Sequence, residues 1–310
     1  MSFTDLPPLP ERVTVREVGP RDGFQNEPEA IPAADKIRLI DALARTGLPR
    51  VEVASFVRPD VIPQLSDAAE VLAGISIPDG VATAVLVPNQ RGLEGALGYA
   101  DRIDDVIVFL SASESHNLAN INRPVADSLA TVEQLLPQIA QAGLRPLASI
   151  ATSFGCPYEG HVPAQRVYEL AEAMAAAGAR EISFGDTTGM ANPRQVREFY
   201  AGALERLAGI ELTAHLHNTR GQGLANALAA LETGVTSFES SFGELGGCPV
   251  PPGSTGNIAT EDLASMLHEM GVQTGVDLDA LLAVSREVQS VLGRPLGSHL
   301  LTAGPVIWNS

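Results

Sequence analysis

Short apolar runs rich in β-branched residues alternate along the chain with longer segments in which apolar side chains recur every three or four positions. The short runs predict strands at residues 13–18, 50–55, 81–87, 105–110, 146–152, 181–184, 210–217 and 236–240. Between the strands, the helical spacing i, i+3, i+4, i+7 is met, for example, by Val167, Leu170, Ala171 and Met174. The pattern therefore predicts strands and helices in strict alternation.

Prolines and glycines mark the ends of the predicted helices. Helices are expected to open with a proline in the first turn at Pro32, Pro163 and Pro193, where the missing N–H has no intrahelical partner to lose. Glycines that follow the periodic segments are expected to be C-caps at Gly47, Gly143, Gly178 and Gly234. These signals support the same boundaries as the hydrophobic pattern.

Unbroken strand–helix alternation favours parallel βαβ units, and eight strands is the number that closes a parallel barrel. We therefore predict an α/β fold, a (β/α)8 TIM barrel, in a single catalytic domain that spans residues 1–310. A further helix near 278–292 belongs to a C-terminal segment, about 277–310, packed on the outside of the barrel. A doubly wound open sheet is the alternative, but no Gly-x-Gly-x-x-Gly motif follows the first strand.

The net charge indicates which partners to expect, and the cysteine content indicates whether disulfides are expected. The net charge is −17 and Lys36 is the single lysine, so a nucleic-acid or anionic-membrane partner is not expected. An anionic substrate needs a local group of arginines. The two cysteines, Cys156 and Cys248, lie far apart and do not indicate a disulfide framework. With no signal-peptide pattern or membrane-length apolar run, we predict a cytoplasmic protein.

In such a barrel, catalytic side chains lie at the carboxyl ends of the strands. His215 and His217 are two apart on one strand, so both side chains face the same way and can bind a divalent metal. A hydrogen-bonded pair of histidines without a metal is the other interpretation of this motif. The decision between the two depends on which other side chains reach the same place.

Further polar residues fall at other strand ends. Arg21 and Asp22 follow the first strand, and Asp186 ends the sixth, although Asp22 could be a turn residue and Asp186 a helix cap. Glu52 lies within the second strand, where an unpaired carboxylate is costly, so we predict that it pairs with Arg21. Cys248 lies in a loop rich in glycine and proline, which indicates a reactive rather than a packed thiol. The convergence of these groups favours a catalytic site.

At this point the motifs resemble a known family. The stretch Val-Gly-Pro-Arg-Asp-Gly-Phe-Gln-Asn-Glu at 18–27 resembles the first-strand signature of 3-hydroxy-3-methylglutaryl-CoA lyases, in the superfamily of metal-dependent TIM-barrel lyases and synthases. The resemblance continues at 53–57, 63–64, 87–89, 111–114, 120–122, 155–160, 185–187, 215–217, 246–249, 256–262 and 274–276. It covers nearly the whole chain. The cysteine loop is the part most specific to the lyases.

The resemblance implies a role for each matching position. Ligands to Mg²⁺ or Mn²⁺ are Asp22, His215, His217 and Asn257. Catalytic groups are Arg21, Glu52, Asp186, His215 and Cys248. Substrate-binding residues are Arg21, Gln25, Ser55 and Ser183. Arg21 would neutralise the thioester oxygen, Asp186 would transfer the hydroxyl proton, and Cys248 would protonate the enolate carbon.

The implied reaction is cleavage of 3-hydroxy-3-methylglutaryl-CoA to acetyl-CoA and acetoacetate by a homodimer that binds the acyl-CoA thioester. Positions that depart from the family pattern leave the acyl group and the CoA contacts open: Pro28, Asp60, Asn218, Arg220 and Glu244. A lyase for a differently 3-substituted 3-hydroxyglutaryl-CoA is therefore a second interpretation. A Claisen-type acyltransferase that condenses acetyl-CoA with a 2-oxo acid is a third, and Cys248 argues against it. A non-catalytic metal-binding protein is disfavoured because the reactive positions are all filled.

Overall fold

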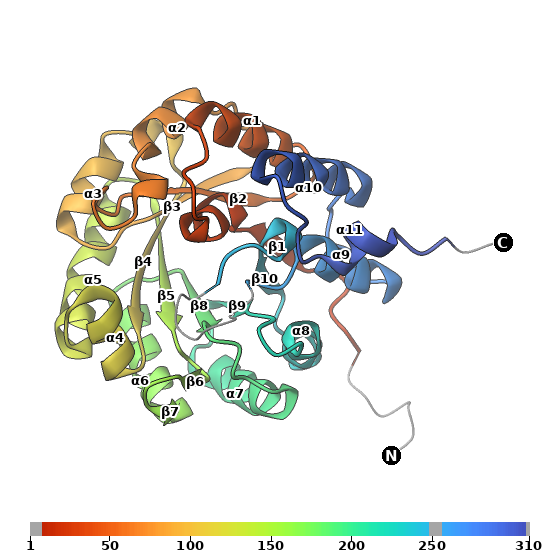
Figure 1. Cartoon of the computed structure of the whole chain (residues 1–310). Coiled ribbons are helices and arrows are strands. Elements are labelled where there is room, and N and C mark those ends of the chain that lie inside the picture. The colour runs from red at the N-terminus through yellow and green to blue at the C-terminus, as the bar shows by residue number, and fades with distance from the viewer. Residues whose placement is uncertain (1–7, 248–255, 308–310) are drawn as a thin grey trace, which may run out of the picture.

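The computed structural model describes residues 8–247 and 256–307, and within them eight parallel strands close into a barrel (Figure 1). The barrel strands are β1 (Thr14–Glu17), β2 (Arg50–Ser55), β3 (Ala82–Leu86), β4 (Asp105–Ser111), β5 (Arg145–Ala151), β8 (Glu181–Asp186), β9 (Glu211–Leu216) and β10 (Ser237–Ser240). Each strand pairs with the next in the chain, and β10 pairs with β1 to close the barrel. The predicted fold class is confirmed, and every predicted strand is present.

Helices surround the barrel on the outside, as Figure 1 shows. The helices are α1 (Ala33–Leu43), α2 (Ala68–Gly74), α3 (Gln90–Leu97), α4 (Glu114–Ile121), α5 (Val125–Gln141), α6 (Ala164–Ala176), α7 (Pro193–Arg206), α8 (Gly223–Glu232), α9 (Thr260–Glu269), α10 (Leu278–Leu292) and α11 (His299–Ala303). A two-stranded hairpin, β6 (Gly155–Cys156) with β7 (Gly160–His161), follows β5. Helix α10 is the predicted additional helix and packs against α1 and α9. No helix in the described part of the chain is both long and apolar enough to cross a bilayer.

The predicted prolines and glycines lie close to the helix ends, but Gly47 lies three residues beyond Ala44, the C-cap of α1. Pro32 and Pro163 precede the first residues of α1 and α6, and Pro193 is the first residue of α7. The four predicted C-cap glycines all have positive φ. At Gly47 a side chain is excluded twice over, because φ is +83° and a Cβ would lie 2.1 Å from the carbonyl oxygen of Gly275. At Gly47 the local backbone conformation and a distant contact therefore both require glycine.

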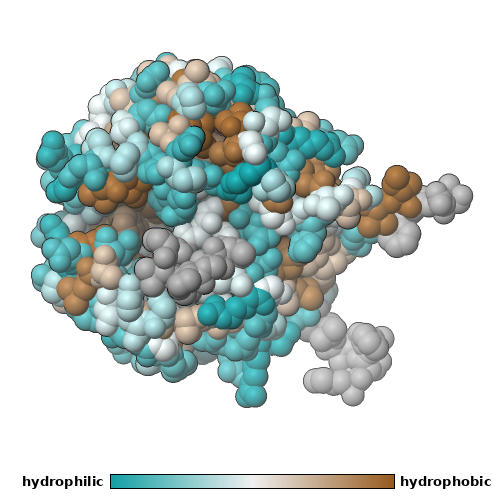
Figure 2. Space-filling view, viewed as in Figure 1, coloured by the Kyte–Doolittle hydropathy of each residue, from teal (hydrophilic) through white to brown (hydrophobic). Residues whose placement is uncertain are grey.

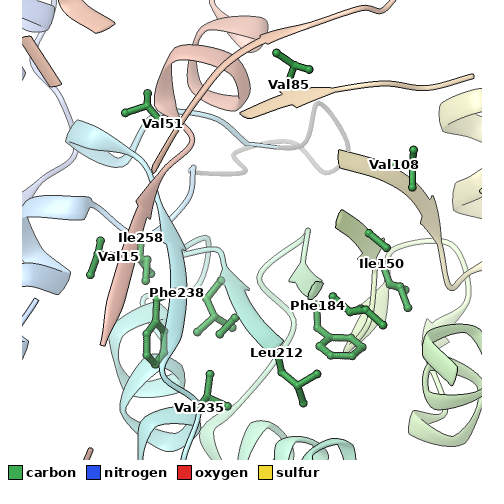
Figure 3. Packing of buried hydrophobic residues seen from close by; sticks show 14 of the residues in the cluster. Val15, Val51, Val85, Val108, Ile150, Phe184, Leu212, Val235, Phe238 and Ile258 are labelled. Carbon is green, nitrogen blue, oxygen red and sulfur yellow. The ribbon is translucent and has the colours of Figure 1, made fainter. Parts of the chain in front are cut away.

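The apolar core lies between the strands and the helices. Val15, Val51, Val108 and Phe238 are on their strands' outward faces, as Figure 3 shows for part of the cluster, and all are 0% exposed. Residues on the inward faces are largely polar, because consecutive side chains on a strand alternate between the faces. The barrel interior is therefore the place where charged groups of different strands meet.

At the amino ends of the strands these charged groups neutralise one another. The Arg50 guanidinium contacts Glu181 at 2.9 Å and Asp105 at 2.5 Å, and Arg16 pairs with both Glu181 and Glu211. Burial lowers the pKa of Arg16 to about 10, with a further lowering by the charge of Arg50. Buried charges of this kind are tolerated only when they are mutually paired. The charged side chains at the amino ends of the strands are therefore paired with one another. The candidate catalytic groups lie at the opposite, carboxyl ends.

Candidate active site

A cavity of about 200 Å³ lies at the carboxyl ends of the barrel strands. Among the residues that line it are Arg21, Asp22, Glu52, His215 and His217, which come from β1, β2 and β9 or the turns that follow them. Around this site, the face of the molecule in Figure 2 is largely hydrophilic, with smaller apolar patches between the polar areas. The cavity therefore brings together the residues that the sequence placed at separate strand ends.

Asp22, His215 and His217 offer ligand atoms that all lie within 4.8 Å of one another. The Nε2 atoms of the two histidines are 3.1 Å apart, so the predicted same-face orientation is confirmed. Asn257 joins the group, since its Nδ2 donates to Asp22 Oδ2 at 2.7 Å. Its Oδ1 is buried and has no hydrogen-bond partner among the described residues. When the Asn257 side chain presents Oδ1 on the side of Asp22, this oxygen joins the Asp22 carboxylate and the two imidazole nitrogens. The four groups form an oxygen and nitrogen donor set that suits a divalent cation.

Different surroundings set the protonation of the two imidazoles. Burial, and then the charge of His215, lower the pKa of His217 to about 3, so this ring is neutral and its lone pair is available. His215 Nδ1 lies 2.9 Å from Glu239 Oε2. A carboxylate behind a histidine fixes the tautomer and leaves Nε2 free to bind a metal. The two Nε2 atoms lie within hydrogen-bond distance of each other, and together with Asp22 they also form a group that could hold a metal ion.

Glu239 is a residue that the sequence reasoning missed. Burial alone would raise its pKa, but hydrogen bonds and the charge of His215, with a hydrogen bond from Ser183, lower the pKa to about 2. Ser183 Oγ donates to Glu239 Oε2 at 2.7 Å. Ser183, which was predicted to bind substrate, does not line the cavity. The available signal was the inward position of Glu239 in β10, whose register sets it beside His215.

Arg21 lies in the single turn Gly19–Gly23 after β1. Its Nε and Nη2 donate to the two oxygens of Glu52 at 2.6 and 2.9 Å, and Nη1 donates to Asp22 Oδ1 at 2.6 Å. The predicted Arg21–Glu52 pair is thus confirmed. Within residues 8–247 and 256–307, three of the five guanidinium N–H groups are engaged, which leaves two for a ligand in the cavity. Gln25 also lines the cavity, and its amide donates to Asp22 Oδ1 at 3.0 Å.

Asp186 ends β8 beside the cavity residues Gly185 and Thr187. Its Oδ1 accepts the backbone N–H groups of Met190 and Ala191 at 2.8 and 3.0 Å. The buried Oδ2 has no hydrogen-bond partner in the part of the chain that the structure describes. Burial raises the pKa of Asp186 to about 7 against these hydrogen bonds. Asp186 is not the cap of the next helix, because Asn192 caps α7.

Four predicted site residues in the described part of the chain do not line this cavity: Ser55, Ser183, Asp186 and Asn257. Ser55 lines a neighbouring cavity of about 280 Å³ together with Arg58 and Arg91, and its buried Oγ has no hydrogen-bond partner among the described residues. Cys248 lies outside the residues that the structure describes. Cys156, in the described part of the chain, is a buried free thiol.

Helix α4 contributes two cavity residues to which the sequence analysis assigned no role. His116 and Asn120 line the cavity, and His116 Nδ1 is 2.7 Å from Ser111 Oγ. Asn120 belongs to the stretch 120–122 of the family resemblance, whereas His116 lies outside the matching stretches. What the sequence did not show is that this helix folds over the carboxyl end of β4.

Arg220, which departs from the family pattern, donates from Nη1 to the carbonyl oxygens of Thr188 and Gly189 at 2.7 and 2.9 Å. It thereby connects the loop after β9 to the loop after β8. Its positive charge also lowers the pKa of Asp186, although less than burial raises it. Arg220 therefore acts on the proton affinity of a site residue as well as on loop geometry.

The closed barrel and the group of Asp22, His215 and His217 define the class, a TIM-barrel enzyme with a candidate metal site at the carboxyl ends of its strands. The family model described as HMGL-like matches residues 12–288, and the chain belongs to this family of lyases. The hydroxymethylglutaryl-CoA lyase of Bacillus subtilis is 47% identical over 95% of this chain and 98% of the relative. The (R)-citramalyl-CoA lyase of Chloroflexus aurantiacus is 42% identical over 96% of both chains. The crystal structure of the Bacillus subtilis HMG-CoA lyase superposes with a TM-score of 0.93 at 47% identity, covering 96% of this chain and 99% of that one.

Proposed function

We propose that this protein cleaves 3-hydroxy-3-methylglutaryl-CoA to acetyl-CoA and acetoacetate with Mg²⁺ or Mn²⁺ bound at Asp22, His215, His217 and Asn257. The observation that carries the proposal is the convergence of Arg21 and the Asp22–His215–His217 group on one cavity in a lyase of the HMGL-like family. Two carboxyl or amide oxygens with two imidazoles suit either ion, and water and substrate complete the coordination.

The chemistry requires a base, a stabilised enolate and an acid. When bound, the divalent cation withdraws charge from the substrate's 3-hydroxyl group and so eases loss of its proton. Asp186 accepts that proton, and its pKa of about 7 keeps a substantial ionised fraction at neutral pH. The oxygen left on C3 forms a carbonyl as the C2–C3 bond breaks. The electron pair of that bond passes to C2 and the thioester oxygen as an enolate.

Arg21 stabilises the enolate. Arg21 lines the cavity, and two of its N–H groups bind neither Glu52 nor Asp22, so they can donate to the thioester oxygen as it gains negative charge. Glu52 holds the guanidinium plane by two hydrogen bonds, so the donors are oriented before the substrate arrives. Proton delivery to C2 then yields acetyl-CoA. We assign this last step to Cys248 on the strength of the sequence motif.

The same chemistry fits a second substrate. In (R)-citramalyl-CoA the carboxylate is attached directly to the hydroxyl-bearing carbon, and cleavage gives pyruvate in place of acetoacetate. The 42% identity to a lyase named for this substrate favours testing it. The two substrates differ by one methylene, a difference that hydrophobic pockets separate by only about 1–3 kcal/mol.

A substrate panel tests the proposal. The purified protein with Mg²⁺ or Mn²⁺ is offered both thioesters, and acetoacetate, pyruvate and acetyl-CoA are measured. Acetoacetate release with the higher kcat/KM supports the proposal, whereas a higher kcat/KM for (R)-citramalyl-CoA assigns the second function. Acetyl-CoA with 2-oxo acids is the control for the condensing direction. Net condensation without thioester cleavage would contradict both assignments.

We further propose that the chain acts as a single catalytic domain, as a homodimer and in the cytoplasm. The family match from 12 to 288 supports one domain, since it spans most of the chain. Dimerisation is tested by light scattering over a range of protein concentrations.

A further inference from the structure

Glu17, at the end of β1, is a buried carboxyl group that the proposed chemistry does not use. It is 0% exposed. Its Oε1 accepts two backbone N–H groups, from Gly19 at 2.7 Å and from Phe242 at 3.0 Å. Its Oε2 accepts the hydroxyl of Thr260 at 2.8 Å. A single side chain thus binds three segments that are far apart in the sequence.

Two of these segments, at Gly19 and at Phe242, lead to residues of the candidate active site. Gly19 begins the turn that carries Arg21 and Asp22. Phe242 begins the turn Phe242–Glu244, after which the carbonyl oxygen of Leu245 accepts from the backbone N–H of Asn257 at 3.3 Å and from its Nδ2 at 3.2 Å. The spacing between the two turns therefore determines how Asn257 meets Asp22.

The turn that begins at Gly19 and the turn that begins at Phe242 are in close contact. A Cβ at position 19 would lie 2.6 Å from the Phe242 ring and 2.7 Å from Glu17 Oε1, so only glycine allows this packing. Burial raises the pKa of Glu17 to about 8, so the group is largely a neutral carboxyl at pH 7. A glutamine has the same shape: its Oε1 can accept the same two backbone N–H groups, and its Nε2 can donate to the hydroxyl oxygen of Thr260.

We propose that Glu17 is a positioning residue that sets the distance between the Arg21–Asp22 turn and the Leu245–Asn257 contact, and so assembles the metal-binding group. The inference deepens the proposed function and rests on it for the kinetic readout. Hydrogen exchange tests it without any assumption about the reaction.

The variants are Glu17→Ala, Glu17→Asp and Glu17→Gln. Alanine removes the bridge, and aspartate shortens its reach by one C–C bond, about 1.5 Å. Glutamine keeps the bridge. Asp262→Ala is the matched control, because Asp262 is also a buried carboxylate that accepts backbone N–H groups, from His299 and Leu300 of α11, which holds no candidate site residue.

The first readout is hydrogen–deuterium exchange of the folded, metal-free variants. Exchange in the peptides that contain Gly19–Gly23 and Phe242–Glu244 should rise together in Glu17→Ala and Glu17→Asp, stay at the wild-type level in Glu17→Gln, and be unchanged there in Asp262→Ala. If Glu17→Ala does not fold, the aspartate variant carries the test. Wild-type exchange in the aspartate variant, or a rise in only one of the two segments, overturns the proposal.

The second readout is Mn²⁺ affinity by titration, with steady-state kinetics beside it. Loss of a contact behind metal ligands lowers metal affinity roughly 10–100-fold, and we expect this in Glu17→Asp but not in Glu17→Gln. kcat should fall more than KM changes. If the wild type binds Mn²⁺ but cleaves no thioester, the proposed function fails while this inference survives. If Glu17→Asp binds Mn²⁺ and turns over like the wild type, the inference fails and the proposed function stands.

Discussion

Replacement of Arg21 by lysine tests the step at which the enolate forms. The guanidinium uses three N–H groups on Glu52 and Asp22 and retains two for the cavity, counted among the described residues. A lysine ammonium has three N–H groups at one point, and the two carboxylates already present at this place can take all of them. The variant thus keeps the charge and loses the donors that face the substrate.

The expected size of the effect follows from this count. Loss of one preorganised oxyanion donor lowers kcat by roughly 10²–10³, or about 2.7–4 kcal/mol of transition-state stabilisation. Both free donors are lost here, so we expect the upper part of that range. KM should change much less than kcat, because the charge that favours the enolate exists only late in the reaction.

Steady-state cleavage of the thioester by Arg21→Lys, measured at saturating metal, gives both parameters. Arg194→Lys is the matched control, since Arg194 is an exposed arginine that pairs with Glu198 on the outer surface of α7. This control should retain wild-type kcat. A kcat for Arg21→Lys within about twofold of the wild type would refute the reasoning and assign Arg21 a structural role.

Four further predictions follow from the site and the barrel. Because burial raises the pKa of Asp186 to about 7, protonation of this base below pH 7 should lower kcat, and Asp186→Asn should abolish the acid limb together with most activity; an unchanged pH profile in that variant contradicts the assignment. Chelation should stop turnover, Mg²⁺ or Mn²⁺ should restore it, and His217→Ala should bind Mn²⁺ more weakly with a retained circular dichroism spectrum; full activity after exhaustive chelation excludes a metal role. Cys248→Ser should lose most of kcat with little change in KM, while Cys156→Ser should be milder; wild-type cleavage by the first variant moves the acid elsewhere. Glu181→Gln leaves buried arginines without a full counter-charge and should reduce the free energy of unfolding by about 3–5 kcal/mol in urea titrations, whereas an unchanged midpoint would show that the ion network is dispensable.

Local sequence patterns contained the architecture of the protein. The eight strands, the helix that became α10 and the glycine helix ends are each properties of a short stretch, because backbone geometry and side-chain periodicity act over a few residues. The same holds for His215 and His217, whose shared orientation is a consequence of strand geometry alone. Pairing of Glu52 with Arg21 also followed, because a buried carboxylate needs a partner and the turn after the neighbouring strand β1 offered one.

Other features were decided only when distant strands came together. The register of β9 against β10 sets Glu239 beside His215, and Ser183 then binds Glu239 rather than lining the cavity. Closure of the barrel sets β1 beside β10, which is what allows Glu17 to reach Phe242 in addition to the nearby Gly19. Asp186 is not the helix cap that its position suggested, because α7 begins only after Asn192, which caps it. Strand register and barrel closure depend on the packing of the whole chain, so no single stretch contains the information that places these residues.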